Sequence, residues 1–218
     1  GNDNKGNVMI DLYNWHTSNG RKLFIMLEEL GAEYNTHAIN IGKDDQFTPE
    51  FTAINPNGKI PAMIDRDGPG GAPFALFESG AMLMYLADKF GKFLPPVEDV
   101  RNRYITIQWL MFQMGGIGPM FGQAHHFRRA QTQVEYGIER YTREARRLWG
   151  VLDSHLAENE YMHQDYSIAD MAIFPWTARY DWQGVALEEF PNAKRWYDTV
   201  AARPAVAKSM AINLAEAA

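Results

Sequence analysis

The first ninety residues switch repeatedly between the alternating pattern of a strand and the three-to-four spacing of a helix. Residues 8–13 alternate apolar and polar positions, which predicts a strand. The helix after this strand is expected to be capped by Ser18 or Asn19 and to end at Gly31, since these residue types favour the two ends of helices. Its buried face is predicted from apolar residues at helical spacing: Leu23, Met26, Leu27 and Leu30.

Further strands are predicted at residues 34–41, 61–65 and 74–77. Thr48-Pro49-Glu50 opens a short helix, and Ser79 starts a longer one. A helix between the first two strands implies a parallel crossover, whereas the Gly- and Pro-rich turn at 66–73 implies an antiparallel hairpin. The order β-α-β-α-β-β-α predicts a thioredoxin-like α/β domain over residues 8–93.

The second half of the chain shows helical spacing only. Leu94-Pro95-Pro96 interrupts the pattern and is the expected linker to an all-α domain over residues 98–210. Helices are predicted at 98–114 and 134–159, and from Ser167 and Pro191 onward. Gly115-Gly116 is expected to break the first of these helices. Ser167-Ile168-Ala169-Asp170 has the pattern of a capping box, with Asp in the Glu position.

Composition removes several classes of protein. The net charge of −6 and the isoelectric point near 5.5 argue against a nucleic-acid partner. No apolar run approaches the ~20 residues of a membrane span. The polar residues 1–7 lack the apolar core of a signal peptide and are expected to be a frayed or truncated leader. The 218 residues include no cysteine, which fits a cytoplasmic protein.

The segment after the first strand carries the most informative chemistry. A thioredoxin-type fold places a Cys-x-x-Cys redox pair there, but this chain has Thr17-Ser18-Asn19-Gly20. A helix N-terminus favours a thiolate, and the Thr17 hydroxyl and Asn19 amide can each donate a hydrogen bond to it. The alternative is that these side chains only cap the helix. Because the chain contains no cysteine, any thiol chemistry must use a sulfur that the protein binds.

Two further motifs predict where a peptide and an anion bind. Ile60-Pro61 suits a tight turn with a cis peptide bond, which would present the Ile60 backbone to an extended peptide; an ordinary trans proline is the alternative. Ser79 at a helix N-terminus can bind a carboxylate, and Glu78 can accept from an ammonium group; a plain helix cap is the alternative. Gln46 and Lys59 can reach the far carboxylate of such a peptide, or are plain surface residues.

A metal site is not expected. His125-His126 are adjacent on a predicted helix and point about 100° apart, and no neighbouring Asp, Glu or Cys completes a ligand set. Aromatic stacking or packing is the expected role of these histidines.

The chain resembles the cytosolic glutathione transferases over nearly its full length, on the evidence of Ile60-Pro61, Glu78-Ser79 and the box at 167–170. The segment 15–20 is similar to that of the Nu class, the bacterial glutathione-dependent disulfide-bond oxidoreductases. A yeast nitrogen-catabolite regulator with a transferase-like domain is a close relation. Segments 121–127 and 138–141 also resemble this group.

The resemblance implies the glutathione transferase fold, an α/β thioredoxin-like domain followed by an all-α domain, assembled as a homodimer. It implies glutathione as bound substrate, two molecules per site, lying over Ile60, Glu78 and Ser79. Thr17 and Asn19 would adjoin its sulfur, with Gln46 and Lys59 at the glycyl end. Arg140 would pair with a glutathione carboxylate. The implied activity is reduction of a disulfide by bound glutathione thiolates, with weak transferase activity.

Two other functions stay open. The same thiolate would serve conjugation to an electrophilic small molecule, or thiolytic removal of glutathione from an aromatic thioether. Such reactions need an aromatic pocket, expected from Trp15, Phe121, His126 and Trp182. The third possibility is a non-enzymatic glutathione-binding regulatory domain, as in the yeast relative. Against it, the chain has no long Asn/Gln-rich segment.

Overall fold

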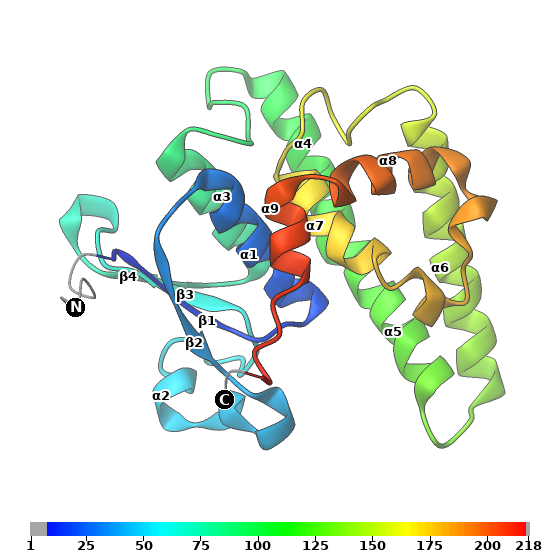
Figure 1. The fold of residues 1–218 in the computed structure, drawn as a ribbon, viewed down its shortest axis with the longest axis horizontal. Coiled ribbons are helices and arrows are strands. Elements are labelled where there is room, and N and C mark those ends of the chain that lie inside the picture. The colour runs from blue at the N-terminus through cyan, green and yellow to red at the C-terminus, as the bar shows by residue number, and fades with distance from the viewer. Residues whose placement is uncertain (1–7, 217–218) are drawn as a thin grey trace. The chain divides into compact units, whose positions relative to one another are not determined.

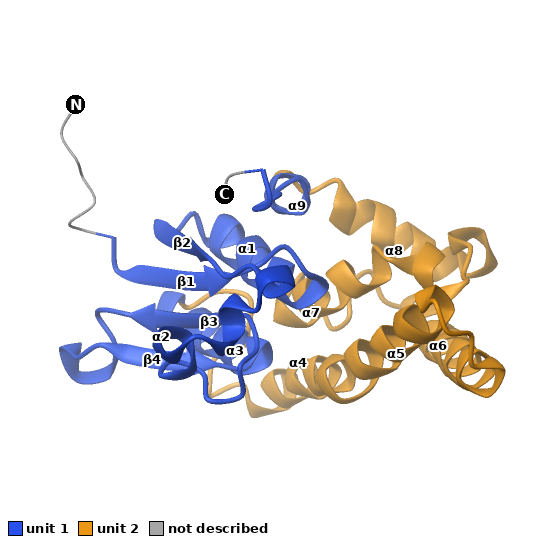
Figure 2. Ribbon diagram, turned by 90° about the horizontal axis from the view of Figure 1, so that it is seen from below, with its two compact units in different colours: residues 1–90, 205–218 blue, residues 91–204 orange. Residues whose placement is uncertain are grey.

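A computed structural model describes residues 8–216, which form two compact units, coloured separately in Figure 2. The first unit contains the described residues up to Phe90 together with those from Ala205 onward, and the second runs from Gly91 to Pro204. The domain limits 8–93 and 98–210 stay a prediction. The expectation for residues 1–7 lies outside the described residues.

The first unit is built on a four-stranded sheet with the strand order β2-β1-β3-β4 (Figure 1). Its strands are β1 (Ile10–Asn14), β2 (Tyr34–Ala38), β3 (Ala62–Asp65) and β4 (Phe74–Phe77). β1 is parallel to β2 and antiparallel to β3, and β3 is antiparallel to β4. The predicted parallel crossover and hairpin are confirmed. Because β1 is an inner strand, its apolar residues Ile10 and Leu12 are buried.

The helices of the first unit are α1 (Ser18–Leu30), α2 (Pro49–Thr52), α3 (Ser79–Phe90) and α9 (Pro204–Met210). Short 3₁₀ segments lie at Ile41–Lys43, Asp45–Phe47 and Pro69–Gly71. α1 packs against α3, and the predicted β-α-β-α-β-β-α order is confirmed. α9 lies beside α1 (Figure 1), where the Arg21 guanidinium donates to the Ser209 and Met210 carbonyls at 2.9 Å.

The second unit is helical throughout its regular structure, as predicted. Its helices are α4 (Val100–Phe112), α5 (Gly118–Arg129), α6 (Glu135–Leu156), α7 (Ile168–Thr177) and α8 (Pro191–Ala201). Short 3₁₀ segments lie at Tyr180–Gln183 and Leu187–Glu189. None of the helices between residues 8 and 216 is long and apolar enough to span a membrane.

The predicted break at Gly115-Gly116 is wrong. A π-helical segment, Gln113–Ile117, carries the chain directly from α4 into α5. Glycine weakens a helix by only about 1 kcal/mol, which tertiary packing overrides. Of the three glycines in this stretch only Gly118 is crowded, since a Cβ on it would lie 2.7 Å from the side-chain nitrogen of Gln113.

The capping box at the start of α7 is confirmed. The Ser167 hydroxyl accepts from the Ala169 N–H at 3.2 Å, and the Asp170 carboxylate accepts from the Ser167 N–H at 3.0 Å. Asp170 also accepts from the Met162 N–H at 3.0 Å and from the Trp196 indole at 2.8 Å. Burial raises the pKa of Asp170 to about 6, against the lowering effect of these hydrogen bonds. This carboxylate is the centre of a structural junction.

Candidate functional site

The loop after β1 ends in Thr17, which is the N-cap of α1. Its backbone is extended, with φ −79° and ψ 170°, and its hydroxyl oxygen accepts from the Gly20 N–H at 3.1 Å. The prediction that Ser18 or Asn19 caps this helix is wrong, because the chain becomes helical one residue earlier. Since the Thr17 oxygen accepts this bond, its hydroxyl proton is available for donation. Capping and donation to a ligand are therefore compatible.

Gly20 and Asn14 hold this loop close to the helix. A Cβ on Gly20 would lie 1.9 Å from the Trp15 carbonyl oxygen, so only glycine fits this position. Asn14 is fully buried at the end of β1, and its side-chain nitrogen donates to the Gly20 carbonyl at 2.9 Å. We did not predict this role for Asn14. The signal was a polar residue at the end of a buried strand, followed by a glycine.

The other side chains of the loop differ in exposure. Trp15 is only 8% exposed, and its ring centroid lies 4.7 Å from that of His16. His16 in turn accepts from the Leu214 N–H at 3.3 Å. Thr17 and Asn19 are both half-buried. The cap and first turn of α1 thus present a hydroxyl and an amide at a partly exposed helix N-terminus.

The turn before β3 contains the cis peptide bond predicted between Ile60 and Pro61. Asn55 shapes this turn from within, since its side-chain nitrogen donates to the Lys59 carbonyl at 2.7 Å. The Asn55 side-chain oxygen accepts from the Asn57 N–H at 2.9 Å. Asn55 is 2% exposed, whereas Lys59 is exposed and Ile60 is half-buried. The turn therefore presents Lys59 and part of Ile60 to solvent.

Gln46 lies against this turn. A Cβ on Gly58 would meet the Gln46 carbonyl oxygen at 3.4 Å and the Phe47 ring at 3.2 Å. Gln46 is half-buried, and its side-chain oxygen has no hydrogen-bond partner among the described residues. The fold therefore brings together two predicted site segments that lie about a dozen positions apart in the chain.

Glu78 and Ser79 join β4 to α3. Glu78 has φ +73°, a left-handed conformation that costs a residue with a side chain of this kind about 1–3 kcal/mol. Its carboxylate is exposed, whereas Ser79 is 4% exposed at the first position of α3. No acidic residue occupies the first turn of α3. The strained backbone places an acid and a hydroxyl side by side at a helix N-terminus.

Lys22 is the residue that sequence reasoning missed. It lies on α1 with 0% exposure, and its ammonium nitrogen donates to the Ser79 hydroxyl oxygen at 3.1 Å. Burial lowers its pKa to about 7, although the Glu78 carboxylate opposes this shift. The available signal was a lysine directly before the apolar run 23–27, on the same helix face as Met26.

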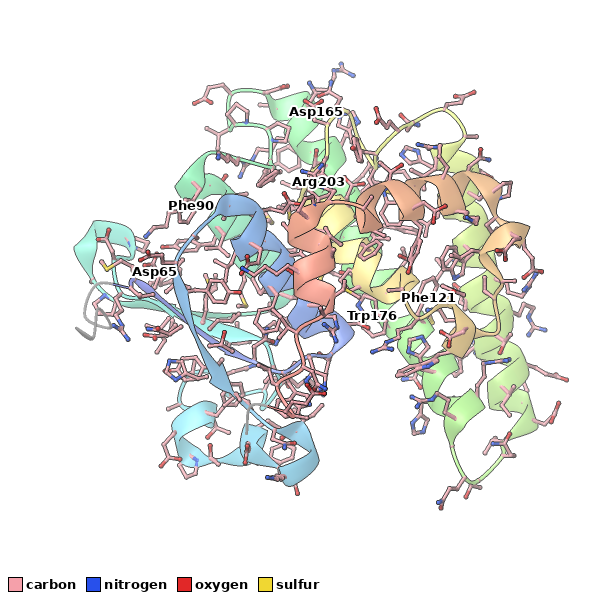
Figure 3. The ribbon with its side chains drawn as sticks, in the orientation of Figure 1. Asp65, Phe90, Phe121, Asp165, Trp176 and Arg203 are labelled. Carbon is pink, nitrogen blue, oxygen red and sulfur yellow. The ribbon has the colours of Figure 1, made fainter. Side chains whose placement is uncertain are left out.

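The remaining predicted residues lie in the second unit. Arg140 lines a hollow of about 290 Å³ on α5 and α6, together with Met120, Tyr141, Arg143 and Glu144. His126 is exposed at the end of α5. Phe121, labelled in Figure 3, is fully buried and stacks on Trp149 at 5.9 Å. The side chain of Phe121 thus belongs to the core of this unit.

Trp182 lies in a cluster of arginine and aromatic side chains. The guanidinium carbons of Arg129 and Arg179 lie 3.6 and 4.3 Å from its ring centroid, and the His125 ring meets its edge at 5.4 Å. His125 also stacks on Trp176 at 5.8 Å. Burial and the two arginines lower the pKa of His125 to about 4, so the imidazole is neutral at pH 7. In residues 8–216 no three potential ligand side chains form a metal-binding group.

Two protein-family profiles match this chain. "Glutathione S-transferase, N-terminal domain" matches residues 18–89, and "Glutathione S-transferase, C-terminal domain" matches residues 118–204. The disulfide-bond oxidoreductase YfcG of Escherichia coli (strain K12) is 44% identical over 205 residues, which cover 93% of this chain and 94% of that protein. The chain belongs to the glutathione transferase family.

Solved glutathione transferase structures share the fold. One from Pseudomonas fluorescens, with two glutathione bound, has a TM-score of 0.89 and 46% identity, covering 95% of each chain. One from Pseudomonas putida, with one glutathione disulfide bound per subunit, has a TM-score of 0.89 and 44% identity, covering 96% of this chain and 94% of that one. The predicted architecture of an α/β unit and an all-α unit is confirmed.

Proposed function

We propose that this transferase is a glutathione-dependent disulfide-bond reductase with weak glutathione transferase activity. The observation that carries the proposal is the start of α1. Where a redox dithiol would stand, the chain places Thr17, whose oxygen is occupied as a cap and whose proton can be donated. The name of the Escherichia coli relative and the glutathione disulfide in the Pseudomonas putida structure support this choice.

In the proposed mechanism, Thr17 and Asn19 donate hydrogen bonds to the sulfur of one glutathione and stabilise its thiolate. The thiolate attacks one sulfur of the substrate disulfide, so that one S–S bond forms and one breaks, releasing a thiolate that takes up a proton. The thiolate of a second glutathione then attacks the mixed disulfide. The products are two substrate thiols and one glutathione disulfide, so two electrons pass from the two glutathiones to the substrate.

Glutathione is proposed to lie along the first unit with its backbone on Ile60, its γ-glutamyl group at Glu78 and Ser79, and its glycyl end near Gln46 and Lys59. The proximity of the Gln46 loop to the Gly58–Lys59 turn supports the last assignment. In the second unit, Arg140 is proposed as the partner of a glutathione carboxylate. Its hollow, which it shares with Arg143, offers the positive charge that this role needs.

We also assign the chain to the Nu class and propose a homodimer in the cytoplasm. α4 carries exposed apolar side chains on one face, with Val100, Tyr104 and Met111 exposed by 59%, 65% and 46%. Such a stripe is typical of a surface that a second protein covers. Sedimentation of the purified protein as a single 24.8 kDa chain would contradict the dimer.

A reaction on aromatic substrates is the second candidate, and the environment of Trp182 favours it. Two guanidinium groups lie over its indole ring, and such planar cations suit packing against an electron-rich aromatic thioether. Trp15 and His126 stay predicted members of that pocket, whereas Phe121 is enclosed in the core of the second unit. In this reaction the thiolate stabilised by Thr17 would attack a carbon or a thioether sulfur instead of a disulfide.

The test compares two assays on purified wild type, Thr17→Ala and Thr17→Ser. One follows reduction of a small disulfide by glutathione, and the other follows conjugation to an electrophilic aromatic compound. We expect Thr17→Ala to lose about 100-fold in reductase activity and Thr17→Ser to retain most of it. Thr48→Ala is a matched control, because Thr48 caps α2 in the same way. Dominant conjugation by the wild type, or full reductase activity in Thr17→Ala, would overturn the mechanism.

A further inference from the structure

The ammonium group of Lys22 is an unusual feature of the first unit, because a lysine side chain is rarely enclosed completely. It shows 0% exposure, yet its nitrogen lies 3.1 Å from the Ser79 hydroxyl oxygen. The hydroxyl belongs to the residue that opens α3, next to the exposed Glu78 carboxylate. The side chain thus reaches from inside α1 to the inner side of the proposed γ-glutamyl subsite.

We infer that Lys22 is a positioning residue of that subsite, which turns the Ser79 hydroxyl proton toward a bound carboxylate and supplies the buried positive charge behind it. A lysine ammonium donates hydrogen bonds and accepts none, so the Ser79 oxygen accepts from Lys22 and its own proton points elsewhere. A ligand cannot touch Lys22 itself, since no part of it is exposed. Its effect passes through Ser79. The inference rests on the proposed function, because it takes glutathione as the ligand.

The charged side chains around Lys22 fit this positioning role. Glu78 is the charged group whose field acts on Lys22. The other ionisable side chains of α3 have different roles, because Tyr85 and Lys89 both bind Asp65, and Asp88 is exposed.

The charges on and beside α1 also face other groups. Arg21 donates to the carbonyls at the end of α9, and Glu28 pairs with Lys208 at 2.8 Å. A carboxylate on Ser79 would add a second negative charge on the ligand side of the ammonium group.

This arrangement links ligand binding to a proton. Burial keeps the pKa of Lys22 near 7 in the unliganded protein, so the amine is largely neutral at pH 8. A bound carboxylate raises this pKa, because it stabilises the charged form. Binding at pH 8 therefore takes up part of a proton, and the dissociation constant rises by about tenfold in total as the pH passes from below 7 to above 8.

The experiment uses S-methylglutathione, whose sulfur cannot ionise and so contributes no proton of its own. Titration calorimetry in two buffers of different ionisation enthalpy, HEPES and Tris at pH 8 and MES and Bis-Tris at pH 6, measures the protons taken up by the wild-type protein. We expect about 0.4 proton per ligand at pH 8, which is the uptake that tenfold stronger binding to the charged amine implies, and about 0.1 proton at pH 6. A wild type that binds S-methylglutathione at pH 8 without proton uptake overturns the inference, and this result needs no variant.

Lys22→Met keeps the length of the side chain and removes its charge. We expect it to weaken binding about tenfold at pH 6, and much less at pH 8, where the wild-type amine is already neutral. A merely structural role would give the same ratio at both pH values. Lys208→Met is the control, because Lys208 is an exposed lysine of the same unit, and it should leave affinity and proton uptake unchanged.

Two results separate this inference from the proposed function. If the wild type reduces disulfides with glutathione while Lys22→Met binds S-methylglutathione as the wild type does at both pH values, the inference fails and the function stands. If the wild type takes up the proton but reduces no disulfide, the inference stands and the reductase function fails. If Lys22→Met does not fold, Ser79→Ala replaces it, and unchanged proton uptake by that variant would overturn the inference.

Discussion

The N-termini of α3 and α7 both carry a serine, Ser79 as the first residue of α3 and Ser167 as the N-cap of α7, but their surroundings differ. At α7, Ser167 and Asp170 close the helix with groups from the chain itself, and the carboxylate is fully buried among four donors. At α3, Ser79 has no acid in the turn that follows, and a buried lysine lies behind it. A helix N-terminus attracts an anion in both cases. The difference is whether the acid folds back onto the first turn, as Asp170 does, or stands exposed before it, as Glu78 does.

Removing the acid at the N-terminus of α7 should lower the free energy of unfolding more than any change at α3. Asp170→Ala removes the acceptor of buried N–H and O–H groups from Met162, Ser167 and Trp196. Each stranded donor costs about 1–3 kcal/mol, so we expect a loss of at least about 3 kcal/mol in the free energy of unfolding. Urea denaturation followed by circular dichroism measures it.

Asp99→Ala is the matched control for the N-terminus of α7. Asp99 caps α4 with a single backbone bond of 3.3 Å and is half-buried. Its removal should cost about 1 kcal/mol. Equal losses in the two variants would show that the buried carboxylate of α7 is no more than an ordinary cap.

The buried Lys22 behind the N-terminus of α3 should make the free energy of unfolding depend on pH. The pKa of Lys22 falls from its ordinary value of 10.5 to about 7 on folding, so the unfolded chain binds more protons between these values. Stability therefore rises with pH in that window, by up to about 1.4 kcal/mol per pH unit from this group. The difference in unfolding free energy between the wild type and Lys22→Met, measured from pH 7 to 10, should rise accordingly. A difference that stays level over this range would contradict a buried, titrating lysine.

The smallest effect concerns the strained residue before α3. Glu78→Gly should stabilise the unliganded protein by about 0.5–1 kcal/mol, because glycine adopts φ +73° without penalty. The same change removes the proposed acceptor of the glutathione ammonium, so the dissociation constant of glutathione should rise about tenfold. Thermal unfolding and calorimetry measure the two effects.

Gln164→Gly is the control that separates the gain in stability from the loss of glutathione affinity. Gln164 lies in the second unit and also has a left-handed backbone, with φ +50°. It should stabilise the protein to a similar degree and leave glutathione binding unchanged. Weaker glutathione binding in this variant would show that strain relief alone, and not the lost carboxylate, disturbs the subsite.

Local patterns were sufficient for much of the fold. The alternation in β1, the capping residues of α2 and α7, and the glycine after α1 act over a few residues, so their sequence neighbours reveal them. The errors arose where packing overrode a local preference. Gly115-Gly116 stays helical in a π segment, and the cap of α1 is one residue earlier than expected.

The residues of the candidate site also fall into two groups, those that local sequence reveals and those that only packing brings together. Thr17, Ile60, Glu78 and Ser79 lie in turns at the ends of elements, where residue type and position along the chain indicate a ligand. Lys22 interrupts an otherwise apolar helix face, and its partner Ser79 stands 57 positions away. Only the packing of α1 against α3 makes these two side chains neighbours.

The sequence by itself determined the order of strands and helices, the family and the absence of a thiol from the place where a redox cysteine would stand, because each of these is a property of residue type and local spacing. The tertiary structure alone decided which polar groups are enclosed. It removed the Lys22 ammonium from water and seated it behind Ser79, and it buried Asp170 among donors from three segments. The physical reason is that the free energy of a charge depends on the solvent and partners around it, and distant parts of the chain supply both only after folding.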